Sequence, residues 1–188
     1  MLEDNDIDIT GWDLRKALRL MQKSNAPLIE RLQSPIVYLE NEAVHAELLE
    51  LAQQFYSPIA TVHHYLSMCK KCYEDVAGKD EYKLKKFFYA LRTAVACQWI
   101  CERDLLPPIE FVKMLDGLDF DAGLRQRIDE LIVLKSTQNE AYLHQGEAAL
   151  IEYIEQRIAA TEEVAQTLPP AHGNSEALDT FFRKTLRV

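Results

Sequence analysis

The stretch YKLKKFFYALRTAVACQWICER, residues 82–103, decides the fold of this chain. With each residue turned by about 100° along a helix, its apolar side chains fall on one broad arc, which predicts an α-helix. Three polar residues, Lys85, Tyr89 and Arg92, follow the edge of that arc, with Arg103 beyond them. Because an apolar arc this wide needs burial on more than one side, we expect the central helix of a bundle.

The rest of the chain is also mainly helical by pattern. Ser57 and Pro58 open a helix that ends near Gly78, so it and the central helix should form an αα-hairpin. Proline positions, capping residues and apolar periodicity predict further helices over residues 13–23, 27–32, 41–55, 108–115, 121–136, 139–167 and 175–188. The predicted fold class is mainly α, a helical bundle with a short N-terminal β-strand.

That strand is the alternating segment DNDIDIT, residues 4–10. A single strand is not stable without a partner, so we expect it to fray or to form a homodimer through residues 1–10. The pattern divides the chain into the strand region 1–10, a helical domain 11–168, a linker 169–174 and a C-terminal helix 175–188. The C-terminal helix is amphipathic and should dock on the bundle or on a neighbouring molecule.

The charge balance limits the partners of the protein. Its 188 residues include 21 basic and 30 acidic side chains, a net charge of -9. This argues against unspecific adhesion to nucleic acid or membrane over the whole surface, although a local basic site stays open. No apolar run is long enough for a membrane span, and the acidic N-terminus is unlike a secretory signal, so we expect a cytoplasmic protein.

Four cysteines occur as CKKC, residues 69–72, and CQWIC, residues 97–101. The spacing suggests a metal site, but Cys69 falls within the apolar arc of its own helix. In an antiparallel hairpin that turns near Gly78, the two pairs also lie far apart. We therefore expect buried or half-buried free thiols, with zinc or a redox pair as the alternative.

Several stretches together resemble a known family. They are IDITGWDLRKAL at residues 7–18, KSN at 23–25, SPIVY at 34–38, and KLKKFFYALR at 83–92 followed by Trp99 and Ile100. In this order they resemble the YcgL-type nucleotidyltransferases of the DNA polymerase β superfamily. The resemblance implies a small α/β nucleotidyltransferase domain joined to a helical C-terminal region. It also implies transfer of a nucleoside monophosphate from a nucleoside triphosphate to an acceptor, with Mg²⁺ as cofactor.

The chain departs from this family at the catalytic motifs. The family carries a Gly-Ser motif at a helix start and then an Asp-x-Asp pair on a strand, but no Gly-Ser dipeptide occurs here, and no such helix precedes residues 6–8. By the match, Asp8 is the third catalytic carboxylate and a metal ligand, and residues 1–10 are a remnant of the nucleotidyltransferase domain. One carboxylate cannot hold two divalent ions, so we predict no transferase activity from this chain alone.

Part of a substrate site can remain in the helical region. Basic and polar side chains that suit phosphate oxygens or a nucleotide base occur in two groups. They are Lys23, Ser24 and Asn25 after the first helix, and His63, Lys70, Lys85, Tyr89 and Arg92 along the edges of the hairpin. The alternative is that these side chains form an ordinary solvated surface.

Two other functions remain open. The chain could be a non-catalytic helical module that binds another protein. A helical ribonuclease using His63 and Arg92 ranks last, because the sequence lacks a compact Arg-x4-His motif.

Overall fold

The structure, a computed structural model, describes residues 10–171 and 173–187. It is mainly helical, as the sequence predicts. Within these residues the elements are α1 (Leu14–Gln22), α2 (Ala26–Leu32), α3 (Glu42–Gln54), α4 (Pro58–Tyr73), β1 (Tyr82–Lys83), α5 (Leu84–Arg103), α6 (Phe111–Asp116), α7 (Ala122–Thr137), β2 (Leu143–His144), α8 (Ala148–Ala165) and α9 (Ser175–Leu186).

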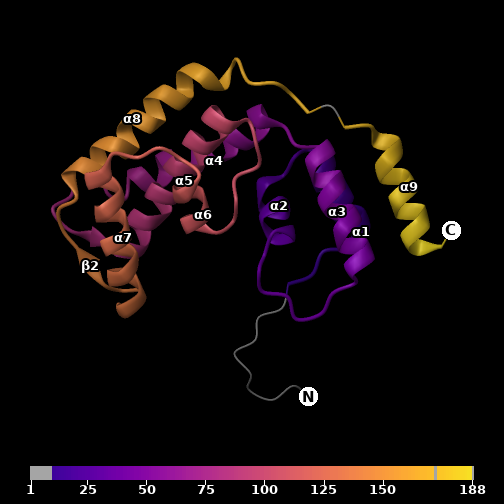
Figure 1. The fold of residues 1–188 in the computed structure, drawn as a ribbon, viewed down its shortest axis with the longest axis horizontal. Coiled ribbons are helices and arrows are strands. Elements are labelled where there is room, and N and C mark those ends of the chain that lie inside the picture. The colour runs from indigo at the N-terminus through magenta and orange to yellow at the C-terminus, as the bar shows by residue number, and fades with distance from the viewer. Residues whose placement is uncertain (1–9, 172, 188) are drawn as a thin grey trace.

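Helix α5 is the central helix of the bundle. It packs against α4, α6 and α8 (Figure 1), and most of its side chains are buried. Helices α4 and α5 form the predicted hairpin, in which the Cys69 thiol lies 3.6 Å from the Ala90 carbonyl oxygen. The wide apolar arc predicted from the sequence is therefore buried on several sides, as expected.

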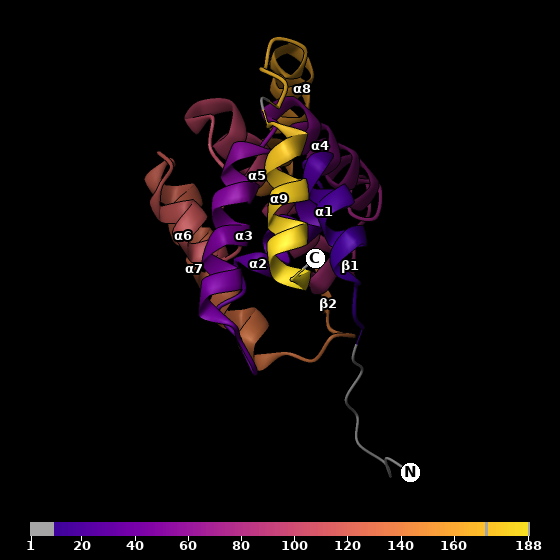
Figure 2. The ribbon, with the colours of Figure 1, turned by 90° about the vertical axis from the view of Figure 1, so that its right-hand side faces the viewer.

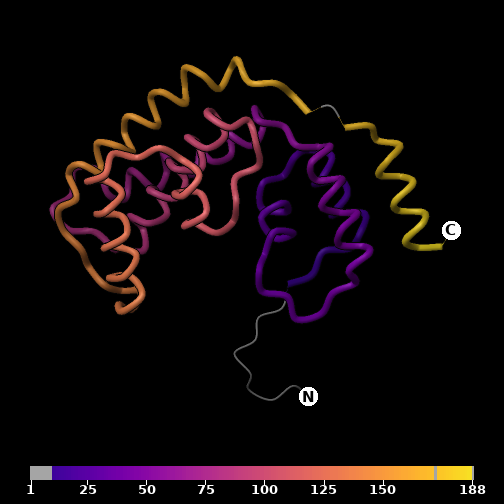
Figure 3. Tube along the Cα trace, in the orientation of Figure 1, coloured from indigo at the N-terminus to yellow at the C-terminus, as the bar shows by residue number. Residues whose placement is uncertain are grey.

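The buried side chains form two apolar clusters. The larger cluster is built on α4, α5, α6, α7 and α8. The smaller one joins α1, α2 and α3 to α9, through residues that include Met21, Phe55 and Phe181. Figure 2 shows α9 lying between α1 and α3, and Figure 3 follows the chain from α8 across to it. The amphipathic C-terminal helix thus docks on its own chain.

Polar side chains tie the two clusters together. The Tyr65 hydroxyl of α4 donates to Glu30 Oε1 of α2 at 2.8 Å, and Arg92 Nη2 of α5 donates to the same oxygen at 3.2 Å. The Ile109 amide donates to Gln33 Oε1 at 3.1 Å. Helix α2 is thereby fixed to α4, to α5 and to the segment before α6.

The sequence prediction was wrong over residues 139–147, which were expected to begin a long helix. Helix α8 begins at Ala148, because Gly146 (φ +87°) and Glu147 (φ +68°) adopt left-handed backbone conformations that interrupt a right-handed helix. Residues 82–83, expected in the central helix, instead pair antiparallel with residues 143–144, with Tyr82 opposite His144. Pairing between these two distant segments therefore replaces the N-terminal end of both predicted helices.

Smaller differences occur at other helix ends. Helix α6 begins at Phe111, not at Pro108, and Asn174 rather than Ser175 is the N-terminal cap of α9. The caps at Asn41 and Ser57 lie where capping residues were expected, and Asp121, expected as the first residue of a helix, is the cap of α7.

Two sequence predictions concern the N-terminus. The strand over residues 4–10 and the homodimer through residues 1–10 rest on residues 1–9, which lie outside the described part of the chain. Within the described part, every helix is too short or too polar to cross a bilayer.

We predict that Gly117→Ala destabilises the protein. A Cβ at Gly117, which follows α6, would lie 2.3 Å from Trp99 Cζ3 on α5, so the ring must shift. We expect a loss of about 2 kcal/mol in the free energy of unfolding, typical of overpacking, measured by urea denaturation. Gly11→Ala is the matched control, because nothing lies within 4 Å of a Cβ there. Equal stability of the two variants would contradict the packing of α6 on Trp99.

Candidate nucleotide-binding hollow

A hollow of about 640 Å³ lies between α5, α6, α7 and the segment after α7. Three of the residues predicted from the sequence, Lys85, Tyr89 and Arg92, line it from the edge of α5. Its other lining residues are Leu84, Phe88, Glu110, Phe111, Val112, Ile132, Lys135, Ser136, Gln138, Asn139 and Glu140. The stripe on the central helix therefore faces a concave surface rather than open solvent alone.

Lys85 lies at one wall of this hollow in an ion pair. Its Nζ is 2.6 Å from Glu140 Oε1, and this hydrogen bond raises the pKa of Lys85 and lowers that of Glu140. Lys135 of α7 lies with its Nζ 5.7 Å from the ring centroid of Phe88. Tyr89 is 45% exposed. Two ammonium groups and an accessible aromatic ring therefore share the hollow.

The guanidinium of Arg92 forms hydrogen bonds within the protein itself. Its Nη1 donates to the Ile109 carbonyl oxygen at 2.7 Å, and its Nη2 donates to Glu30 Oε1. The guanidinium is half-buried. It holds the chain before α6 against α5 and so shapes one wall of the hollow.

The other predicted residues on α4 lie elsewhere. His63 is exposed, and Lys70 forms an ion pair with Glu162 of α8. Neither side chain lines the hollow. The edge set predicted from the sequence is thus split, because Lys70 pairs with α8 while Lys85, Tyr89 and Arg92 line the hollow.

The turn between α1 and α2 contains the remaining three predicted residues. Ser24 is buried with φ +50°, and its Oγ accepts from the Ser57 amide at 2.9 Å and lies 3.3 Å from Thr61 Oγ1. Asn25 Oδ1 accepts from the amide of Leu28 at 3.1 Å and caps α2. Lys23 is exposed. Ser24 and Asn25 therefore make structural contacts, and the turn does not line the hollow.

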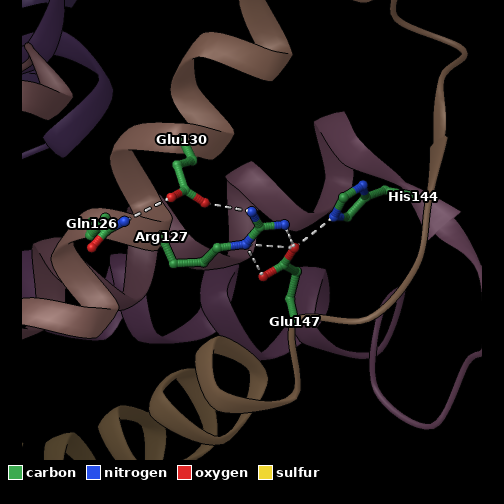
Figure 4. Close-up of polar contacts among 5 residues, drawn as sticks. All are labelled: Gln126, Arg127, Glu130, His144 and Glu147. Carbon is green, nitrogen blue, oxygen red and sulfur yellow. Dashed lines mark hydrogen bonds and ion pairs between the residues drawn. The ribbon is translucent and has the colours of Figure 1, made fainter.

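A compact ionic network supports the wall that carries Glu140. Figure 4 shows Arg127 of α7 between Glu130 and Glu147. Arg127 Nη2 donates to Glu147 Oε1 at 2.6 Å, its Nε to Oε2 at 3.0 Å, and its Nη1 to Glu130 Oε2 at 2.7 Å. His144 Nε2 of β2 lies 2.8 Å from Glu147 Oε1. The network thus ties the segment between α7 and α8 onto α7.

Glu147 has an unusual environment for a carboxylate, since its side chain is only 5% exposed. Burial by itself raises the pKa of Glu147, but the hydrogen bonds from Arg127 and His144 outweigh it, so the pKa is lowered overall. The hydrogen bonds to Glu147 and Glu130 raise the pKa of Arg127. Glu147 is therefore ionised at neutral pH and stabilises the left-handed turn in which it sits.

Sequence reasoning missed Lys135, Glu140 and the supporting Arg127 and Glu147. Glu140 and Glu147 fall within residues 139–167, which the sequence predicts as one helix. The available signal was Gly146, a residue unfavourable inside a helix, which could have separated this segment from α8.

The burial of the cysteines is as the helical pattern predicts, but the two pairs are not far apart, because Cys69 lies near enough to Cys97 to contribute to its raised pKa. Cys69 and Cys97 are buried, and Cys72 and Cys101 are half-buried, all as free thiols. Burial raises the pKa of Cys69 to about 11.

The magnesium site implied by the family resemblance has no counterpart in the described part of the chain. Among residues 10–171 and 173–187, no three His, Cys, Asp or Glu side chains gather closely enough to hold a metal ion. Asp8, the predicted catalytic carboxylate and metal ligand, lies outside these residues.

Comparison with known proteins gives a match over residues 1–184 to RlaP, the RNA repair pathway DNA polymerase beta family. The uncharacterized protein YcgL of Bacillus subtilis (strain 168) is 36% identical over 162 residues. That alignment covers 86% of this chain and 62% of the relative, so the chain spans less than two thirds of the relative's length. No solved structure matches the chain.

We predict that Glu147→Gln lowers stability in a pH-dependent way. Because the pKa of Glu147 is lowered by folding, its contribution is fully present above the ordinary value of 4.5 and is lost as pH falls through the lower, folded-state pKa. We expect a loss of about 2 kcal/mol in the free energy of unfolding at pH 7, shrinking in acid. Urea denaturation across pH measures it, with exposed Glu163→Gln as control. A loss that does not change with pH would exclude the ionic contribution.

Proposed function

Because the chain belongs to the RlaP DNA polymerase beta family of the RNA repair pathway, we propose that it is the helical part of a nucleotidyltransferase. In the proposed reaction, an acceptor hydroxyl attacks the α-phosphate of a nucleoside triphosphate, a new phosphorus–oxygen bond forms, and pyrophosphate leaves. An RNA end is the proposed acceptor, following the description of the family. The hollow between α5, α6 and α7 is the proposed nucleotide site.

One observation carries this proposal: Lys85, Tyr89 and Arg92, separated in sequence by helical spacing, line one hollow together with Lys135. Ammonium groups suit phosphate oxygens as point charges. The exposed pair between Lys85 and Glu140 is weak in water, so a triphosphate oxygen can replace the Glu140 carboxylate at small cost. Lys135 adds a second cation from the facing helix.

The aromatic and guanidinium groups take different roles in this proposal. The half-exposed ring of Tyr89 offers a face on which a base can stack, an interaction that tolerates every base. Arg92 already donates to Glu30 and to the Ile109 carbonyl oxygen, so it acts as a positioning residue that keeps the wall of the hollow in place.

Catalysis itself requires more carboxylates than this sequence supplies at the family's motif positions. We predict no nucleotidyl transfer by this chain alone in an assay with magnesium or manganese, labelled nucleoside triphosphates and mixed RNA acceptors. Turnover that Asp8→Ala abolishes would contradict this and would show that the chain has a complete active site.

A non-catalytic protein-binding module is the second candidate function. It is favoured by the segment between α2 and α3, where four consecutive large apolar side chains are exposed, with Tyr38 at 97% and Leu39 at 96%. Contiguous exposed apolar residues often mark protein interfaces. Under this alternative, the hollow would have no affinity for nucleotides.

We predict saturable binding of ATP, CTP, GTP or UTP to the hollow, measured by magnesium-dependent calorimetric titration. Lys85→Ala and Lys135→Ala should each weaken binding about tenfold, because each removes a charge-assisted contact. Lys79→Ala, an exposed lysine outside the hollow, is the control and should have no effect. Absence of binding at millimolar nucleotide would reject the hollow as a nucleotide site and favour the protein-binding module.

A further inference from the structure

A second concave surface lies in the smaller cluster, between α1 and α9. This groove has a volume of about 500 Å³, and its polar lining includes Arg15 and Arg19 of α1 and Arg183 of α9. Among the residues that the structure describes, Asp179 is the single carboxylate that lines it. We call it the α1/α9 groove; the two helices that form it lie side by side in Figure 2.

Packing of the two helices places the three arginines around one groove. Gln22 Nε2, at the end of α1, donates to Ser175 Oγ, at the start of α9, at 2.8 Å, so the helices run antiparallel. Buried Leu18 and Leu178 form the apolar floor. Arg15 and Arg19 are four residues apart, which places them one helical turn from each other on the same face of α1. Arg183 lies across the groove from them.

Within the described part of the chain, the positive charge of this groove is poorly compensated. Arg92, Arg125 and Arg127 each have a carboxylate partner, whereas Arg15, Arg19 and Arg183 have none among the described residues. Arg15 instead lies with Cζ 5.4 Å from the ring centroid of Phe182. Three guanidinium groups against one carboxylate repel one another, in a chain whose net charge is -9. An anionic ligand would remove that repulsion.

We propose that the α1/α9 groove binds the phosphodiester backbone of a single-stranded RNA. A groove lined by three arginines suits a chain of phosphates, because each guanidinium can donate two parallel hydrogen bonds to one phosphate. Phe182 beside Arg15 adds an aromatic surface that bases can contact. The choice of RNA as the ligand rests on the proposed function, in which this strand is the acceptor. That the groove binds a polyanion follows from its own charge and does not depend on the proposed function.

The test is fluorescence anisotropy of a labelled single-stranded RNA titrated with the whole chain. Arg15→Gln/Arg19→Gln should weaken binding roughly tenfold and reduce the slope of log K against log salt by about 1.4, the value for two lost contacts to a single strand. Lys71→Gln/Lys79→Gln, exposed lysines on and after α4, has the same change in net charge and should leave both quantities unchanged. Thermal melting checks that both variants fold.

Asp179→Asn should change the affinity for RNA in the opposite direction. Removing the single carboxylate of the groove should tighten RNA binding several-fold, because it removes repulsion from the phosphates. Glu163→Gln on α8 is the matched control and should have no effect. A groove that does not contact RNA would leave affinity equal in both variants.

Two further results would overturn the inference. One is RNA binding that Arg15→Gln/Arg19→Gln weakens no more than the lysine control. The other is competition by inorganic triphosphate or polyglutamate as effective as competition by unlabelled RNA at equal charge, which would identify a general anion site or an acidic protein partner. The proposed nucleotide site is tested separately, by nucleotide binding to the Lys85 and Lys135 variants. A wrong assignment of the groove would therefore appear in RNA binding, and a wrong assignment of the hollow in nucleotide binding.

Discussion

Burial of α5 on several sides is the constraint on which the rest of the structure depends. Helices α4, α6 and α8 pack around it, so its apolar and small side chains are almost all inaccessible. A polar residue in such a helix can reach solvent only along the remaining edge. Lys85 and Tyr89 occupy that edge, and the hollow forms where α6 and α7 face it. The candidate site is thus a consequence of how the central helix is buried.

Two apolar clusters joined by polar contacts allow one small chain to carry two separate surfaces. Glu30 links the clusters, because it accepts from both Tyr65 and Arg92. The hollow belongs to the larger cluster and the α1/α9 groove to the smaller one. The two surfaces differ in their lining: Lys85, Lys135 and Tyr89 lie in the hollow, whereas Arg15, Arg19 and Arg183 lie in the groove.

Much of the helical architecture could be predicted from local pattern. The caps at Asn41, Ser57 and Asp121 and the apolar periodicity act within one turn of the chain, so the sequence contains them directly. The segment 139–147 could not be assigned this way, because its pairing with residues 82–83 is a contact between distant positions. Of the candidate site, the sequence provided the three residues on α5, which share one helix face, but not Lys135 or Glu140, which other elements bring to the hollow.

The sequence by itself determined the mainly helical class, the central position of α5, the stripe of Lys85, Tyr89 and Arg92, and the family, through motifs that are contiguous in the chain. Only the tertiary structure decided which polar residues work together. It turned Lys70 toward Glu162, and it committed Arg92 to Glu30 and the Ile109 carbonyl. It also paired α9 with α1 so that arginines more than 150 residues apart share one groove. The physical reason is that helical periodicity fixes the face of a residue, whereas its partner depends on which helix packs against that face.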